Sequence, residues 1–266
     1  MPDAQMPDRP VTTRRDGPLV TLVLSRPARS NPLSLDTMQE LTGALAAAGD
    51  DPAVRAVVIG AEGPVFSAGH DLREVAGADA ALRERIFAAC SELMLTIHRL
   101  AVPVVARVQG LATAAGCQLV AACDLAVAAE GARFATPGVR IGLFCSTPQV
   151  EVVRAVGHTR AMEMLLTGDP IDAATARDWG LVNRVVGADD LDAAAADLAA
   201  RVAEASRATV ASGKRAVADT LDLPIDEAYR HASAVMARDA GTPDAREGIA
   251  AFLGKREPVW PAPDAG

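Results

Sequence analysis

Apolar residues form two kinds of run along the chain, and their order predicts an α/β protein. Short runs rich in Val, Leu and Ile, bounded by Gly, Pro or polar residues, predict buried strands. Apolar positions that recur every three or four residues predict helices between the strands. The expected strands are residues 19–24, 54–59, 104–108, 125–129, 133–135 and 181–186, and the expected helices are residues 34–48, 80–100, 148–156, 159–166 and 172–179.

From residue 191 onward the apolar pattern is helical almost to the end of the chain. Strands that alternate with helices, followed by helices alone, predict an α/β core with a helical C-terminal extension. We therefore expect three regions. Residues 1–16 are polar and Pro-rich and are expected to be flexible, residues 17–200 form the core, and residues 201–266 form the helical C-terminal region.

Composition excludes several classes of protein. Half of the 266 residues are hydrophobic but only 3% are aromatic, so the core is expected to consist of Ala, Val and Leu. The net charge of −8 argues against a surface that binds nucleic acid. No apolar run approaches the ~20 residues that span a membrane. The N-terminus lacks the apolar segment of a signal peptide, and the four cysteines lack CxxC spacing. These features favour a cytoplasmic protein with buried free thiols.

Two stretches of small residues each follow a predicted strand. Residues 110–119 read GLATAAGCQL and lead into a predicted helix, while residues 66–72 read FSAGHDL. The first N–H groups of a helix have no partner inside that helix, and small residues let a ligand approach them. Tight packing between strand and helix is the simpler interpretation of either stretch alone. Together, they predict two backbone N–H groups that converge on one carbonyl oxygen, which is an oxyanion hole.

The pairing and order of these motifs resemble the crotonase superfamily, the enoyl-CoA hydratases and isomerases, over about residues 26–260. The sequence is most similar to the family's enoyl-CoA hydratase domain-containing branch. The resemblance implies a spiral of ββα turns, an acyl-CoA-binding core, and C-terminal helices that build a homotrimer or a dimer of trimers. It also implies that the oxyanion donors are the backbone N–H groups of His70 and Ala115. Coenzyme A is carried by the substrate, so no separate cofactor is expected.

The resemblance also identifies two departures from the family's pattern. Family hydratases use two carboxylates as general acid and base, one just after the small-residue triplet and one at the end of a motif that reads here FATPG. This chain has Gln118 and Gly138 at those positions. Neither residue exchanges a proton near neutral pH. We therefore expect slow or absent hydration, and replacing both residues by glutamate is predicted to raise its rate.

Several other groups are candidates to replace the missing carboxylates. Cys145 is more simply a pocket-lining residue than a nucleophile, because no Lys or His lies near it in sequence to lower its pKa. Glu92 is expected on a solvated helix face. For His70, the backbone N–H is expected to carry the main role, and the imidazole is a secondary candidate for the base. Asp71 is expected to stabilise the turn by accepting local N–H bonds. No third ligand at suitable spacing accompanies His70 and Asp71, so no metal site is expected.

By the resemblance, two further groups of residues contact the substrate. The loop that faces the acyl group contains Leu143, Phe144, Cys145 and Ser146. The coenzyme A end follows residues 26–31 and 67–73, with Phe252 and Lys255 reaching over from a neighbouring subunit; an ordinary basic helix end is the simpler interpretation of Lys255. The expected coenzyme A contacts are Ala28, Ser30, Ser67, Ala68, Asp71, Leu72, Phe252 and Lys255.

The sequence therefore predicts an acyl-CoA-binding enzyme of the enoyl-CoA hydratase/isomerase type. Two alternatives remain open. One is a different reaction on an acyl-CoA thioester, such as isomerisation or thioester hydrolysis. The other is a scaffold that binds coenzyme A thioesters without turnover. No nucleic acid and no membrane span are expected.

Overall fold

The computed structural model describes residues 9–261, and its largest element is a six-stranded mixed sheet. The first strand runs antiparallel to the second, and all the others are parallel. Val58 pairs with Val105 in the centre, where both strands are buried. The strand order is β1 (Val11–Asp16), β2 (Leu19–Leu24), β3 (Ala56–Ala61), β5 (Val104–Val108), β7 (Leu125–Ala129) and β10 (Arg184–Val186).

A second sheet consists of four short strands in the order β4 (Val65–Ser67), β6 (Leu111–Thr113), β8 (Arg133–Ala135) and β9 (Ile171–Asp172). β4, β6 and β8 are parallel, and β9 is antiparallel to β8. Each of β3, β5 and β7 is followed by one of these short strands and then by helix. This repetition is the ββα spiral that the family resemblance implies.

Helices cover both faces of the six-stranded sheet. The main apolar core lies between the sheet and α1 (Leu35–Asp50), α3 (Ala80–Arg99) and α4 (Ala115–Ala122). On the other face, α8 (Leu191–Ala203) packs Leu191, Ala195 and Ala199 against β3, β5 and β7. The remaining helices of the core are η1 (Pro27–Arg29), α2 (Leu72–Gly77), η2 (Pro137–Ile141), α5 (Pro148–Val156), α6 (His158–Thr167), α7 (Ala173–Trp179) and η3 (Ala188–Asp190).

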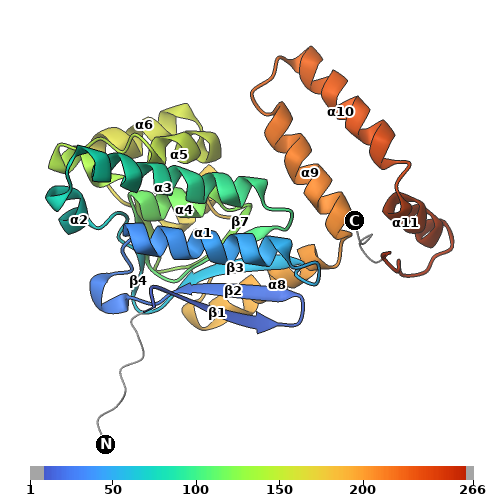
Figure 1. The fold of residues 1–266 in the computed structure, drawn as a ribbon, viewed down its shortest axis with the longest axis horizontal. Coiled ribbons are helices and arrows are strands. Elements are labelled where there is room, and N and C mark those ends of the chain that lie inside the picture. The colour runs from blue at the N-terminus through green and yellow to red at the C-terminus, as the bar shows by residue number, and fades with distance from the viewer. Residues whose placement is uncertain (1–8, 262–266) are drawn as a thin grey trace, which may run out of the picture.

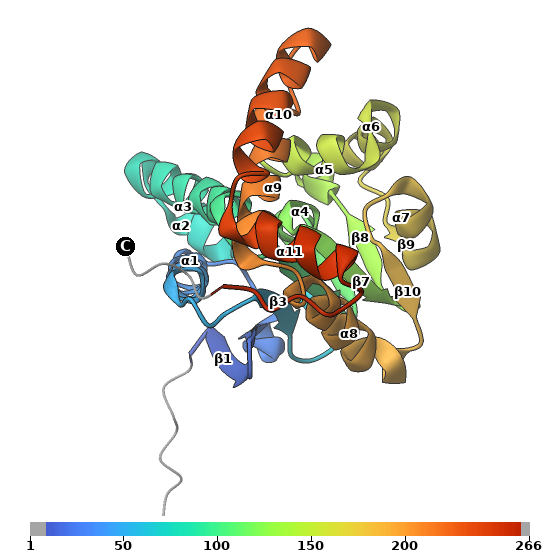
Figure 2. The same cartoon turned by 90° about the vertical axis from the view of Figure 1, so that its right-hand side faces the viewer.

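Three C-terminal helices project away from this core as an arm (Figure 1, Figure 2). They are α9 (Arg207–Thr220), α10 (Ile225–Asp239) and α11 (Pro243–Leu253). α9 and α10 contain no buried residue, and α11 contains only Ala251. No helix within residues 9–261 is long and apolar enough to cross a membrane.

Two sequence expectations need correction. Val11–Asp16 was expected to be flexible, but it forms the antiparallel edge strand β1 because its backbone pairs with Leu19–Leu24. Residues 1–8 of that expected flexible region lie outside the described residues. The predicted strand at residues 181–186 is shorter, because the Leu181 N–H donates to the Ala176 carbonyl at the end of α7. Leu181 is nevertheless buried in the core, which accounts for the apolar pattern.

Candidate functional site

The two small-residue turns meet in space. Gly69 has φ +81°, and a Cβ there would lie 2.8 Å from the Thr113 carbonyl oxygen and 3.0 Å from the Ala115 nitrogen. A side chain would therefore separate the turns, and the positive φ also favours glycine. The close approach joins the end of β4 to the start of α4.

This approach leaves two backbone N–H groups, those of His70 and Ala115, beside each other without a protein acceptor. Ala115 is the first residue of α4, so its N–H has no intrahelical partner. Within residues 9–261 neither N–H donates a backbone hydrogen bond. Ala115 has negative φ, but Ala114 before it has φ +51°, a conformation uncommon for alanine. The turn thus places strain on the residue that precedes the donor.

A cavity of about 580 Å³, which we call the turn cavity, opens in front of these N–H groups. It is lined mostly by apolar side chains from both turns, α2, α3 and η2. Phe87 of α3 and Val75 of α2 also line it but were not predicted, because helical periodicity alone does not show which flank of a helix meets a cavity. The predicted site residues that line it are Ala68, His70, Leu72, Ala115, Gly138, Leu143, Phe144, Cys145 and Ser146.

The His70 imidazole forms part of the wall of the turn cavity. Its ring packs edge-on against Phe87, with centroids 5.1 Å apart and planes at 80°. Both ring nitrogens are buried and neither forms a hydrogen bond. Burial lowers the pKa of His70, and the nearby Leu33 carbonyl only partly opposes that shift. The ring is therefore neutral near pH 7.

Gly138 lies in η2 at one of the two expected carboxylate positions, and the backbone fills the space beside it. A Cβ on Gly138 would lie 2.0 Å from the Leu143 carbonyl oxygen and 2.8 Å from the Cys145 Sγ. The Leu143 N–H also donates to the Gly138 carbonyl at 3.0 Å. No side chain fits at this position unless residues 142–146 move, so the predicted gain from a glutamate at position 138 is not compatible with this backbone.

Gln118 occupies the other expected carboxylate position, one turn into α4. Its side chain is 3% exposed, and its Oε1 accepts a weak bond from the Cys90 Sγ at 3.6 Å. Gln118 does not line the turn cavity. The carboxamide therefore lies behind the cavity wall, between α4 and α3.

The other candidate acid–base groups are poorly suited to proton transfer. Burial raises the pKa of the Cys145 thiol, so a thiolate is disfavoured. Glu92 has a side chain that is 57% exposed and faces Arg99 at 3.5 Å. Asp71 accepts from the Arg73 N–H at 3.0 Å as the N-cap of α2, and it also pairs with Arg29. These contacts match the pocket-lining, solvated and turn-stabilising roles expected from the sequence.

The two segments expected to hold coenzyme A lie side by side. The Ala68 N–H donates to the Ser30 carbonyl at 2.9 Å, and the Ser67 hydroxyl donates to the Asn31 carbonyl at 2.9 Å. Ala28 lies exposed on η1 beside them. Phe252 and Lys255 are instead exposed on the arm, which lies at the other end of the molecule from α2 (Figure 1). Within one chain these two residues do not reach the turn cavity.

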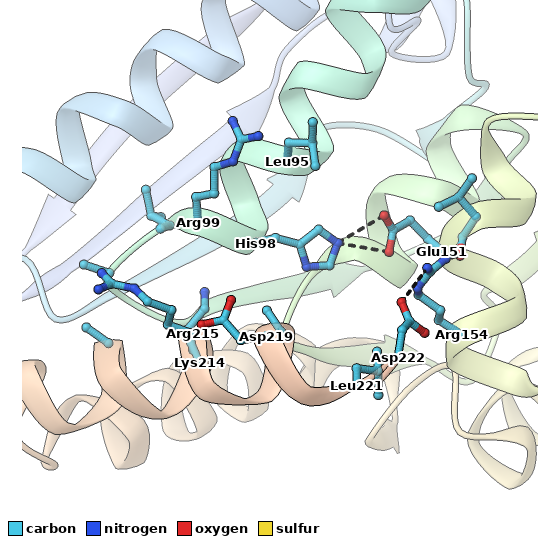
Figure 3. A pocket seen from close by; sticks show the side chains of 15 residues that line it. Leu95, His98, Arg99, Glu151, Arg154, Lys214, Arg215, Asp219, Leu221 and Asp222 are labelled. Atoms are coloured by element: carbon cyan, nitrogen blue, oxygen red, sulfur yellow. Dashed lines mark hydrogen bonds and ion pairs between the residues drawn. The ribbon is translucent and has the colours of Figure 1, made fainter. Parts of the chain in front are cut away.

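A second cavity of about 560 Å³, which we call the arm cavity, lies between α3, α5 and α9 (Figure 3). Its charged side chains are largely paired: His98 contacts Glu151 at 3.1 Å, and Arg154 contacts Asp222 at 3.1 Å. Lys214 donates to Asp124 at 2.6 Å and to the Ile97 and Val102 carbonyls. Sequence patterns do not predict this cluster, because its members come from distant segments.

No group of three His, Cys, Asp or Glu side chains in the described part of the chain is arranged to hold a metal ion. Three of the four cysteines are buried, Cys123 is partly buried, and all are free.

Known proteins resemble this chain over nearly its whole length. A family model described as enoyl-CoA hydratase/isomerase matches residues 15–263. The chain is 45% identical to enoyl-CoA hydratase domain-containing protein 3, mitochondrial, from Danio rerio, over 93% of this chain and 86% of that protein. It is 43% identical to the human protein of the same name, over 95% of this chain and 84% of that protein.

Solved structures agree with these matches. The crystal structure of enoyl-CoA hydratase from Mycobacterium smegmatis superposes with a TM-score of 0.91 at 46% identity, covering 94% of this chain and 98% of that one. The crystal structure of human enoyl-CoA hydratase domain-containing protein 3 superposes with a TM-score of 0.92 at 43% identity, covering 95% of this chain and 100% of that one. The word mitochondrial in the relatives' names is in tension with the cytoplasmic expectation. With its two mixed sheets, ββα spiral and C-terminal helices, the chain belongs to the enoyl-CoA hydratase/isomerase family and has the crotonase fold.

Proposed function

We propose that the chain is an acyl-CoA enzyme that polarises a thioester carbonyl between the N–H groups of His70 and Ala115. The observation that carries the proposal is the pair of unpartnered N–H groups at the mouth of an apolar cavity. Such donors stabilise the negative charge that develops on a carbonyl oxygen during reaction. The apolar wall suits an acyl chain.

Efficient hydration is not part of this proposal. Hydration needs one group to take a proton from water and another to supply one to carbon, and such groups contribute about 10²–10⁴-fold each. Gln118 faces away from the turn cavity, and Gly138 has no room for a side chain. Isomerisation and thioester hydrolysis remain alternatives, as does a scaffold that binds thioesters without turnover.

A panel of coenzyme A thioesters incubated with the pure protein tests the proposal. Mass spectrometry of the products and calorimetry of binding separate turnover from affinity. We expect thioester binding, with slow or absent loss of the crotonyl-CoA enoyl absorbance. A protein that binds no thioester would overturn the proposal, and hydration as fast as that of an ordinary hydratase would reveal a base that we have not identified.

We further propose that the arm is an oligomer contact, in a homotrimer or dimer of trimers. Large apolar side chains on the arm are exposed, and contiguous apolar surface of this kind marks an interface. A monomer by light scattering at micromolar concentration would reject this proposal. The exposed residues are Val217, Leu221, Leu223, Ile225, Tyr229, Met236, Ile249, Phe252, Leu253 and Val259.

An oligomer would also bring Lys255 and Phe252 to a neighbouring subunit's substrate, where Lys255 would face the phosphates of coenzyme A. Lys255→Glu is then expected to weaken coenzyme A binding by about tenfold, because a charge-assisted contact is lost. The same substitution should leave the oligomeric state unchanged. The cytoplasmic location stays a prediction.

A further inference from the structure

The turn cavity contains one polar side chain, His70, whose ring nitrogens form no hydrogen bond, although the Leu33 carbonyl lies near the ring. A neutral imidazole has one N–H donor and one lone pair, and buried groups of this kind nearly always have partners. Both nitrogens of His70 lack one, although the ring lies in the cavity wall against Phe87. Packing alone does not explain a histidine here, because a phenyl ring would fill the same space without an unsatisfied donor.

The other titratable side chains that line the turn cavity are already committed or unreactive. Arg140 forms an ion pair with Asp169, and its Nε donates to the Thr167 carbonyl at 3.0 Å. Cys145 is held as a thiol by its burial. His70 is therefore the one lining side chain in the described residues that is both unpaired and able to accept a proton near neutral pH.

We propose that the His70 imidazole is the base that removes a proton from the α-carbon of the bound acyl thioester. This assignment rests on the proposed function, because the thioester oxygen must first lie on the His70 and Ala115 N–H groups. The ring and one of these donors belong to the same residue, so the α-carbon would lie within a side chain's length of the ring. Both ring nitrogens are buried in this structure, so the proposal includes a turn of the ring about its side-chain bonds that brings one nitrogen to the ligand.

The step balances without any further reactant. The bond between the α-carbon and its hydrogen breaks, and an N–H bond forms on the ring. The electron pair of the broken bond moves to give a thioester enolate, whose oxygen remains on the two backbone N–H groups. The imidazolium then returns the proton to the same carbon or, in a substrate with a neighbouring double bond, to the far end of that double bond. The first outcome exchanges the α-proton with solvent, and the second moves the double bond. Neither involves net oxidation.

Substitution can separate the two roles of His70, because every residue other than proline keeps the backbone N–H. His70→Phe removes the base and preserves a ring beside Phe87, while His70→Asn keeps a polar side chain that cannot act as a base. Both variants should retain the oxyanion donors and bind the thioester with largely unchanged affinity. Circular dichroism and thermal unfolding establish that each variant is folded.

The test uses but-3-enoyl-CoA in D₂O, whose α-protons are activated by both the thioester and the double bond. Calorimetry reports binding, and mass spectrometry reports deuterium incorporated into the acyl group. For the wild type we expect protein-dependent exchange at a rate that is constant from pH 7 to 8 and falls only below about pH 6.5. For both variants we expect exchange to fall by at least about 10²-fold.

The outcomes separate this inference from the proposed function. No thioester binding by the wild type would overturn the proposed function and this inference with it. Binding without exchange, or exchange that persists unchanged in His70→Phe and His70→Asn, would overturn only the assignment of His70 as the base. A wild-type exchange rate that falls below about pH 6.5, together with no such fall in the variants, would support the assignment.

Discussion

The turn cavity and the arm cavity are almost equal in volume but opposite in chemistry. The arm cavity is lined by charged side chains that mostly satisfy one another, as His98 does with Glu151 and Arg154 with Asp222 (Figure 3). The turn cavity is lined mostly by apolar groups, together with two unpartnered backbone N–H groups and the His70 imidazole, and its one ion-paired lining side chain among the described residues is Arg140. Polar groups that already have partners hold elements together, whereas polar groups without partners are available to a ligand. Volume alone does not distinguish the two cavities.

The two cavities also use backbone groups differently. In the arm cavity, Lys214 donates to the Ile97 and Val102 carbonyls, so α9 is attached to the core through the end of α3. In the turn cavity, the close backbone contacts at Gly69 and Gly138 exclude side chains, and the contact at Gly69 lies beside the free N–H groups of His70 and Ala115. Substitutions in the two regions should therefore affect different properties.

Gly138→Ala is expected to have the largest effect. Its Cβ would lie 2.0 Å from the Leu143 carbonyl oxygen, so either residues 142–146 move or the protein loses about 3 kcal/mol of stability. Gly131→Ala is the matched control, because nothing lies within 4 Å of its Cβ position. Urea unfolding and thioester calorimetry measure both effects. Unchanged stability and unchanged binding in Gly138→Ala would show that the loop yields freely, and would restore the case for a glutamate at that position.

Lys214→Met is expected to lower stability by about 2–3 kcal/mol and to leave thioester affinity unchanged. The side chain is 12% exposed, and its removal leaves Asp124 without its ion pair. The neighbouring Arg215→Met removes the same charge and is the control, because Arg215 has no hydrogen bond or ion pair within residues 9–261. Urea unfolding compares the two variants. Equal losses in both would mean that the buried contacts of Lys214 contribute nothing.

Ala114→Gly is expected to stabilise the protein by about 1 kcal/mol. Ala114 has φ +51° and ψ −120°, a conformation that costs an alanine more than a glycine. Part of the gain is offset by the greater freedom of glycine in the unfolded chain. Thermal unfolding measures the change. A lower melting temperature would mean that the strain at this turn is smaller than its dihedral angles suggest.

Much of the fold and part of the site could be predicted from the sequence. The helical C-terminal region, the two small-residue turns and six strands follow from local patterns and family resemblance, and those strands are β2, β3, β5, β7, β8 and β10. The edge strand β1 and the short strands β4, β6 and β9 were not predicted. The obstruction at Gly138 could not be predicted, because the clashing atom belongs to Leu143 and its position depends on the path of the loop. The unpartnered His70 ring and the Lys214 contacts were missed for a related reason. Whether a polar group has a partner depends on tertiary packing, which periodicity does not describe.

The smallest expected effect compares one histidine from each cavity. Glu151 raises the pKa of His98, so that contact stabilises the protein fully below the unfolded pKa of about 6.5 and is lost as pH rises through the folded value. Burial lowers the pKa of His70, so the unfolded state takes up a proton first as pH falls below about 6.5, and stability decreases. The two histidines therefore contribute pH dependences of opposite sign.

The free energy of unfolding of wild type, His98→Gln and His70→Phe at pH 5.5 and pH 8 tests this opposition. His98→Gln should lose more stability relative to wild type at pH 5.5 than at pH 8, by less than about 1 kcal/mol because the pair is partly solvated. His70→Phe should gain stability relative to the wild type at pH 5.5, because the unfolded variant no longer takes up a proton at this position. The same sign for both variants would contradict the comparison, because it would mean that the His70 ring has a partner for its charged form. A fall in the exchange rate at low pH could then no longer be attributed to protonation of a neutral, unpaired ring in the turn cavity.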